Sequence, residues 1–144
     1  MANACLRANL TINIYIPPLT PVHRSQKGWI MQKHITVRPT EGTWVVRAGG
    51  AVIAESTNAL ELTEGDMPFV IYFPRSDVAM AFLDVSDHKT TCPHKGEASY
   101  FDIVSKSMTY SNAVWSYENP NEDVAEIKDH LAFWVQDGVQ VERI

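Results

Sequence analysis

Short runs of alternating apolar and polar residues begin at residue 35 and recur to the end of the chain. Ile35 and Val37 alternate with polar neighbours, which is typical of a half-buried strand, and Pro39 ends the run. The same kind of pattern predicts further strands at 44–46, 52–53, 59–63, 69–73, 90–92, 98–104, 108–117, 132–135 and 139–141.

Glycine-containing turns separate several of these strands. Gly49 and Gly50 lie between two apolar runs, and a pair of glycines supplies the positive φ angles of a tight hairpin turn. A second turn is predicted at 64–66, and Gly138 is expected to turn the chain into its last strand.

Two short helices are also predicted. Pro74 fits the first position of one helix, and apolar residues at 78, 81 and 82 recur at helical spacing, so we expect about two turns ending near Asp84. The second helix is predicted from Asn119 as N-cap, Pro120 in the first turn and Glu122 as the reciprocal carboxylate, with apolar residues at 124, 127 and 131 on one face. The fold class is therefore mainly β with two short helices.

Composition places these elements in one globular domain. Hydrophobic residues make up 45% and charged residues 20% of the 144 positions, values typical of soluble globular proteins. No apolar run reaches the length of about 18 residues that a membrane span needs. We expect a single domain over residues 31–144, cytoplasmic and without membrane association.

Residues 1–30 follow a different pattern. Three prolines at 17, 18 and 21 interrupt any periodicity, and the apolar run at 10–16 contains two polar residues. We expect a flexible, dispensable N-terminal extension, and the alternative is that Met31 is the true start of the protein.

Charge is distributed unevenly along the chain. Residues 1–30 contain three basic residues and no acid, whereas the remainder contains nine bases and 17 acids, a net charge of −8. An acidic body repels a phosphate backbone, so we do not expect nucleic-acid binding.

Three motifs occur in order along the chain. They are Tyr72-Phe73-Pro74-Arg75 with Asp77-Val78, then Cys92-Pro93 with Lys95-Gly96, Ala98 and Tyr100, and finally Trp115-Ser116-Tyr117 followed by Pro120. Together they resemble the bacterial family of domains of unknown function numbered 427, from about Ile35 to the C-terminus. The resemblance implies a β-tent-like fold, two antiparallel sheets pinned at one edge, as in methionine sulfoxide reductase B and the ligand-binding domain of cereblon.

The chain departs from these relatives in two respects. Many β-tent proteins hold zinc with two Cys-x-x-Cys pairs, but Cys92 is the only cysteine after residue 30, so we expect no metal site and no cofactor. The family has also carried a nucleotidyltransferase label. The chain has neither paired aspartates after a Gly-Ser nor a glycine-rich phosphate loop, so we do not expect nucleotidyl transfer.

Cys92, His94 and Lys95 form the one local cluster suited to covalent chemistry. A thiol beside a cation or an imidazole ionises near neutral pH and attacks electrophiles. Residues two apart on a strand share a face, so a continuous strand would bring Cys92 and His94 together, whereas Pro93 between them distorts a strand. The alternative is that Cys92 is a buried packing residue.

Arg75 and Asp77 directly follow a predicted strand, where side chains project from a sheet edge. They suit a polar ligand, with Arg75 as a forked donor and Asp77 as an acceptor. The alternative is that they pair with each other or cap the helix.

The register of the hairpin formed by 98–104 and 108–117 predicts a pocket. A two-residue loop at 105–106 or 106–107 places even positions of the first strand on one face with odd positions of the second. The residues sharing this face are then Cys92, His94, Gly96, Ala98 and Tyr100 together with Ala113, Trp115 and Tyr117. Gly96 and Ala98 leave a hollow that an incompletely buried Trp115 walls, and the alternative is that the rings fill the core.

These observations predict a domain that binds a small molecule or a modified residue in an aromatic-lined cleft between two sheets. The predicted lining residues are Tyr72, Arg75, Asp77, Lys95, Tyr100, Trp115 and Tyr117. Two alternatives stay open. One is a thiol-dependent enzyme with Cys92 as nucleophile or redox thiol, activated by His94 or Lys95, and the other is a protein-interaction module without a deep pocket.

Overall fold

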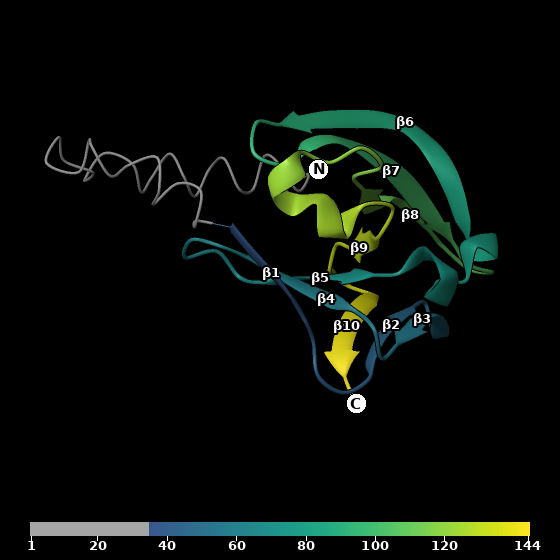
Figure 1. Cartoon of the computed structure of the whole chain (residues 1–144). Coiled ribbons are helices and arrows are strands. Elements are labelled where there is room, and N and C mark those ends of the chain that lie inside the picture. Colours follow the sequence, from purple (N-terminus) through teal and green to yellow (C-terminus); the bar gives the residue numbers. More distant parts are fainter. Residues whose placement is uncertain (1–34) are drawn as a thin grey trace, which may run out of the picture.

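A computed structural model describes residues 35–144 (Figure 1). These residues form two antiparallel sheets connected by short loops and 3-10 turns. The predicted mainly β class with two antiparallel sheets is confirmed. The extension predicted at 1–30 lies outside the described residues.

The larger sheet has seven strands. In spatial order they are β1 (Ile35–Pro39), β4 (Leu60–Glu64), β5 (Val70–Phe73), β9 (Leu131–Phe133), β8 (Thr109–Ser116), β7 (Gly96–Val104) and β6 (Leu83–Cys92). The smaller sheet consists of β10 (Val139–Arg143), β2 (Trp44–Ala48) and β3 (Ala51–Ser56), and the 3-10 turns are η2 (Arg75–Asp77), η3 (Met80–Phe82) and η4 (Glu122–Ile127).

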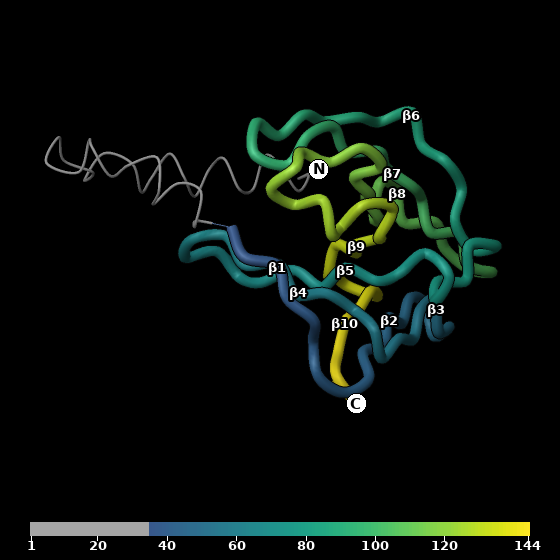
Figure 2. The backbone as a smooth tube through the Cα atoms, in the orientation of Figure 1, coloured from purple at the N-terminus to yellow at the C-terminus, as the bar shows by residue number. Residues whose placement is uncertain are grey.

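The larger sheet folds around η4. Figure 1 shows β1, β4 and β5 on one side of η4 and β6, β7 and β8 on the other. We call the face that contacts η4 the concave face. The smaller sheet packs against the opposite face, and Figure 2 shows the chain returning to it at β10 after completing the larger sheet.

Each face of the larger sheet carries its own hydrophobic core. The core between the two sheets includes Val46, Ile53, Phe73, Val114 and Phe133. The concave core includes Tyr72, Tyr100, Trp115, Val124 and Ile127, so η4 supplies two of its members. Strands in the middle of the larger sheet are therefore buried on both faces.

The predicted Gly49-Gly50 hairpin is confirmed. Ala48 pairs with Ala51 across β2 and β3, and the two glycines between them have φ angles of 57° and 86°. Two consecutive positive φ angles match the twist of the flanking strands, which is why glycine is favoured here.

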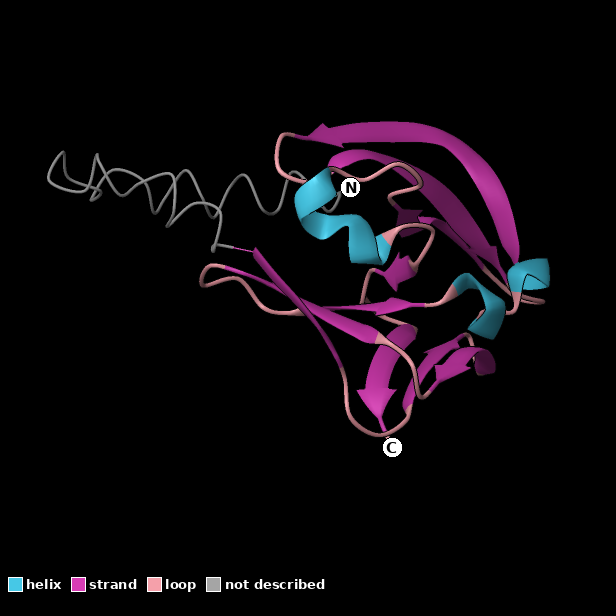
Figure 3. Ribbon diagram, in the orientation of Figure 1, coloured by secondary structure: helices cyan, strands magenta, loops and turns pink. Residues whose placement is uncertain are grey.

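The first predicted helix is wrong. Residues 74–84 instead form the short turns η2 and η3, and β6 begins at Leu83 (Figure 3). Val78 is extended and forms a bridge with Ala54, while the amide of Ala79 donates to the carbonyl of Ile53 at 2.8 Å. Pairing with β3 therefore uses the backbone groups that a continuous helix needs.

The predicted strand at 90–92 is the end of a ten-residue strand, β6. Its first half escaped prediction because the partly buried positions Ser86 and His88 are polar and the apolar Val85 is exposed, so the alternation in burial has no counterpart in apolar residues. Such a polar pattern is common in a strand at the edge of a sheet, the position that β6 occupies.

The second predicted helix is present only as the 3-10 turn η4, which starts later than expected. Its N-cap is Asn121 rather than Asn119, and no side chain caps it. The side-chain Nδ2 of Asn121 instead donates to the carbonyl of Pro93 at 3.1 Å. The backbone N–H of Asn121 donates to the carbonyl of Lys95 at 3.0 Å. Val124 departs from helical geometry, and the predicted face splits because Leu131 belongs to β9.

The register predicted for β7 and β8 is correct in parity, although the loop is longer than expected. Val104 pairs with Thr109, and Tyr100 pairs with Trp115. A bulge between Phe101 and Ile103 shifts the register, and Ala113 consequently lies in the core between the sheets rather than beside Tyr100.

Gly138 is expected to tolerate no side chain. Its φ is +93°, and an added Cβ would lie 2.5 Å from the hydroxyl of Tyr110. We expect Gly138→Ala to lower the free energy of unfolding by about 2–4 kcal/mol, measured by urea denaturation. Gly50→Ala is the matched control, because Gly50 has a φ of +86° with no atom within 4 Å of the added Cβ. Equal losses in the two variants would contradict a steric role for Tyr110.

Candidate functional site

The aromatic residues predicted to wall a pocket do lie together, in the concave core. Tyr72 and Trp115 both pair in register with Ala132, which lies between them. This small residue lets the Nε1 of Trp115 donate to the hydroxyl of Tyr72 at 3.2 Å. Tyr100 and Tyr117 belong to the same cluster.

These rings fill a core, and the predicted hollow beneath them is closed. Trp115 is 3% exposed, so the prediction that it is incompletely buried is wrong. An added Cβ at Gly96 would meet the carbonyl of Asn119 at 3.3 Å, because the chain leading into η4 lies over this glycine. Val124 and Ile127 then cover the remainder of the cluster.

Lys95 is held inside the protein by a carboxylate that the sequence analysis missed. Its Nζ donates to Oε1 of Glu64 at 2.7 Å, and the two side chains are 3% and 4% exposed. Lys95 lies in the turn between β6 and β7, and Glu64 is the last residue of β4. Leu60, Leu62 and Glu64 share a face of β4, so the alternation of that strand was the available signal.

Burial raises the pKa of Tyr72 well above its ordinary value. The hydrogen bond from Trp115 opposes this rise, and the nearby carboxylate of Glu64 adds to it. Tyr72 therefore stays protonated at neutral pH, and its hydroxyl accepts from Trp115 as a neutral group.

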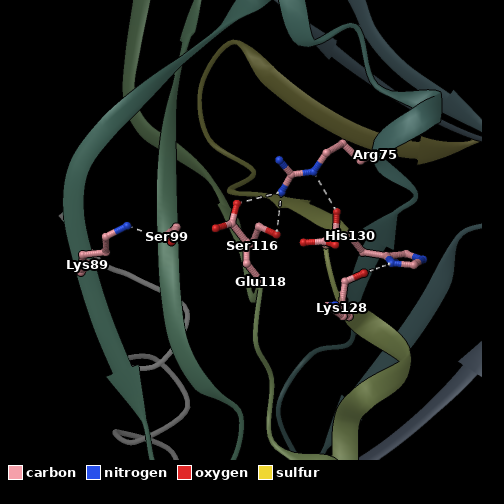
Figure 4. Close-up of polar contacts among 8 residues, drawn as sticks. Arg75, Lys89, Ser99, Ser116, Glu118, Lys128 and His130 are labelled. Atoms are coloured by element: carbon pink, nitrogen blue, oxygen red, sulfur yellow. Dashed lines mark hydrogen bonds and ion pairs between the residues drawn. The ribbon is translucent and has the colours of Figure 1, made fainter.

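Arg75 and Asp77 do not join the aromatic cluster. Arg75 donates to the carbonyl of Asp129, to Oγ of Ser116 and to the carboxylate of Glu118 at 3.1–3.3 Å (Figure 4). Ser116 alternates with Trp115 along β8, so these contacts lie on the face opposite the concave core. Asp77 accepts from the Ser56 hydroxyl at 2.6 Å and ties η2 to β3.

Cys92 and His94 do not share a strand face. β6 ends at Cys92, and His94 lies in the turn before β7 begins at Gly96. Cys92 is 1% exposed and packs in the concave core, whereas His94 is partly exposed. The thiol and the imidazole therefore do not meet on one strand, and the burial of Cys92 agrees with the packing alternative.

A cavity of about 400 Å³ lies between the two sheets. Its lining consists of Trp44, Phe69, Val70, Ile71, Trp115, Phe133, Val135 and Val141 together with the charged residues Glu142 and Arg143. Four of these residues are aromatic, and Trp44 meets Phe69 edge to face with 6.2 Å between ring centroids. Of the seven predicted ligand residues, only Trp115 lines this cavity.

A second cavity of about 370 Å³ adjoins the first and is polar. Its lining consists of Arg38, Pro39, Thr40, Glu41, Trp44, Glu61 and Arg143. Trp44 and Arg143 line both cavities. The two residues are register partners across β2 and β10, so their side chains project side by side from one face of the smaller sheet.

A family model for a domain of unknown function, DUF427, matches residues 36–144. The chain belongs to the DUF427 family. This confirms the resemblance that three short motifs predicted, and the matched segment contains every residue lining the two cavities. A comparison with curated proteins found no match.

Two further findings concern the described part of the DUF427 domain. No helix in residues 35–144 is long and apolar enough to cross a membrane. Within the same residues, no three His, Cys, Asp or Glu side chains gather as a metal site would require. The absence of a metal in the protein stays a prediction.

In the DUF427 domain, Lys95 and Glu64 each keep a charge buried only because the other is present, so we expect their contributions to stability to be coupled. Lys95→Met leaves Glu64 buried without its cation, and we expect a loss of about 3–5 kcal/mol in the free energy of unfolding. The double variant Lys95→Met, Glu64→Leu removes both charges and is expected to recover most of that loss. Urea denaturation of the three proteins measures the coupling, and additive losses would contradict it.

The thiol of Cys92 is expected to react slowly with iodoacetamide at neutral pH, because the side chain is 1% exposed. A Cys5→Ser background leaves Cys92 as the one remaining thiol. We expect alkylation of the folded protein, followed by mass spectrometry, to be at least about 100-fold slower than in urea. Comparable rates in the two conditions would favour the thiol-enzyme alternative.

Proposed function

We propose that this DUF427 domain binds a small molecule in the cavity between its two sheets, and we call this cavity with its polar neighbour the intersheet groove. The observation that carries the proposal is the gathering of four aromatic residues, three from the two sheets and Phe69 from the loop before β5, around a cavity of about 400 Å³. Ligand pockets are commonly of this size and are lined by apolar and aromatic residues with a few polar groups.

The rings favour a flat apolar body as the part of the ligand inside the groove. Trp44 projects from the smaller sheet, while Phe133 and Trp115 belong to the larger one. Phe69 is 50% exposed at the rim, where it can pack against an entering molecule. Apolar side chains on opposing walls provide stacking and edge contacts to a planar group.

Arg143 favours an anionic group on the same molecule. None of the ion pairs found among residues 35–144 involves Arg143. The carboxylate of the neighbouring Glu142 is bound by Arg47 at 2.6 Å rather than by Arg143. A guanidinium recognises carboxylates and related oxyanions through paired N–H donors.

Trp44 supports a ligand that carries a hydrogen-bond acceptor. Its Nε1 is buried and finds no acceptor among the described residues. A buried donor without a partner costs about 1–3 kcal/mol. A ligand acceptor that meets this N–H after a small rotation of the indole would recover part of that cost.

Burial of Cys92 disfavours the thiol-enzyme alternative. The thiol is 1% exposed and lines neither cavity of the intersheet groove. A nucleophile must reach its electrophile, so the arrangement supports binding over catalysis by this residue.

The test uses 1-anilinonaphthalene-8-sulfonate, a planar aromatic anion, as probe. We expect saturable fluorescence enhancement with one site per chain. Phe69→Ala should weaken the dissociation constant about fivefold, because the ring contributes apolar contact area. Val85→Ala is the matched control, since Val85 is 79% exposed and lines neither cavity.

Arg143→Gln should also weaken probe binding, about tenfold, while Lys106→Gln, an equal change of charge in the exposed loop between β7 and β8, leaves it unchanged. Circular dichroism confirms that each variant is folded. Equal probe affinity in Phe69→Ala, Arg143→Gln and the controls would place the binding elsewhere and overturn the proposal.

A further inference from the structure

The polar half of the intersheet groove carries charges of both signs. Arg38 and Arg143 contribute two guanidinium groups to it, and Glu41 and Glu61 contribute two carboxylates. The polar cavity shares Trp44 and Arg143 with the aromatic one, so the two cavities lie next to each other on either side of these residues.

The charges in this cavity are only loosely paired with each other. Nε of Arg38 lies 3.6 Å from Oε1 of Glu61, beyond the distance of an N–H···O hydrogen bond, and the Arg38 side chain is 65% exposed. Thr40 donates its hydroxyl to the carbonyl of Ala59 at 3.2 Å and is already engaged. Carboxylates and guanidinium groups are therefore the ones available to a ligand.

We propose that the ligand of the intersheet groove is a free α-amino acid with a large apolar side chain, bound as its zwitterion. The inference rests on the proposed function and names the ligand class for the same groove. The side chain lies among the rings of Trp44, Phe69 and Phe133, the α-carboxylate meets Arg143, and the α-ammonium meets Glu61 with Glu41 nearby.

The charges in the polar cavity favour a zwitterion over an apolar anion or an apolar cation. An apolar anion alone would bring its charge toward two arginines but leave Glu41 and Glu61 unused and repelling. An apolar cation alone would face the unpaired Arg143. A zwitterion places opposite charges on adjacent atoms and satisfies both signs within one small head group.

The order of the groups along the groove agrees with this head-and-tail arrangement. Arg143 lies at the junction of the two cavities, and Glu61 lines the polar cavity alone. The apolar lining lies on the other side of the junction. A side chain attached to the carbon that bears both charged groups therefore points from the junction into the aromatic cavity.

The test compares three probes by isothermal titration calorimetry at pH 7. They are L-phenylalanine, 3-phenylpropanoate, which lacks the ammonium, and 2-phenylethylamine, which lacks the carboxylate. We expect L-phenylalanine to bind about tenfold or more tightly than either analogue, since each analogue loses one charge-assisted contact.

Two charge-removing variants assign the contacts. Glu61→Gln should weaken L-phenylalanine and 2-phenylethylamine but leave 3-phenylpropanoate unchanged or tighter. Arg143→Gln should weaken L-phenylalanine and 3-phenylpropanoate but leave 2-phenylethylamine unchanged or tighter. Lys106→Gln, remote from the groove, controls for net charge.

The outcomes separate this inference from the proposed function. Binding of the naphthalene sulfonate probe without any preference for L-phenylalanine over its two analogues overturns the zwitterion and leaves the groove as a binding site. Failure of both the sulfonate and L-phenylalanine to bind overturns the two proposals together. The crossed pattern of Glu61→Gln and Arg143→Gln supports the zwitterion.

Discussion

The strand β8 is buried on both of its faces, and it contributes side chains to both hydrophobic cores of the molecule. Val114 points into the core between the sheets, and Trp115 points into the concave core. Alternation along a single strand thus serves two separate apolar layers, as in sheets covered on both sides. The bulge at Asn112, with a φ of 52°, adjusts this alternation so that Ala113 and Val114 both serve the core between the sheets.

Patterns confined to neighbouring residues were sufficient for much of the fold. The two glycines of the β2–β3 turn and the parity of the β7–β8 hairpin followed from local geometry, and Tyr100 does pair with Trp115. The prediction of the first helix was wrong because a contact distant in the sequence decides the structure there. Its spacing was helical, but the backbone at Val78 and Ala79 pairs with β3, and tertiary pairing overrides local preference.

The groove could not have been predicted from local patterns. Trp44 and Arg143 come from the two ends of the described chain and meet only because β2 pairs with β10. Glu64 was more accessible to prediction, because a carboxylate on the apolar face of β4 indicates a buried partner. Lys95 was selected from its motif as a ligand residue, but its ammonium is bonded to Glu64.

Trp115 contributes both to the cavity between the sheets and to the concave core. Trp115 is one of the residues that line the aromatic cavity, while its side chain packs in the concave core and its Nε1 is bonded to Tyr72 there. Evolution of new ligand specificity is therefore constrained at this position, since a substitution that reshapes the cavity also disturbs a core. Phe69 is half exposed at the rim and belongs to neither hydrophobic core, so its side chain is free to vary with the ligand. The groove is thus expected to diversify from its rim inward.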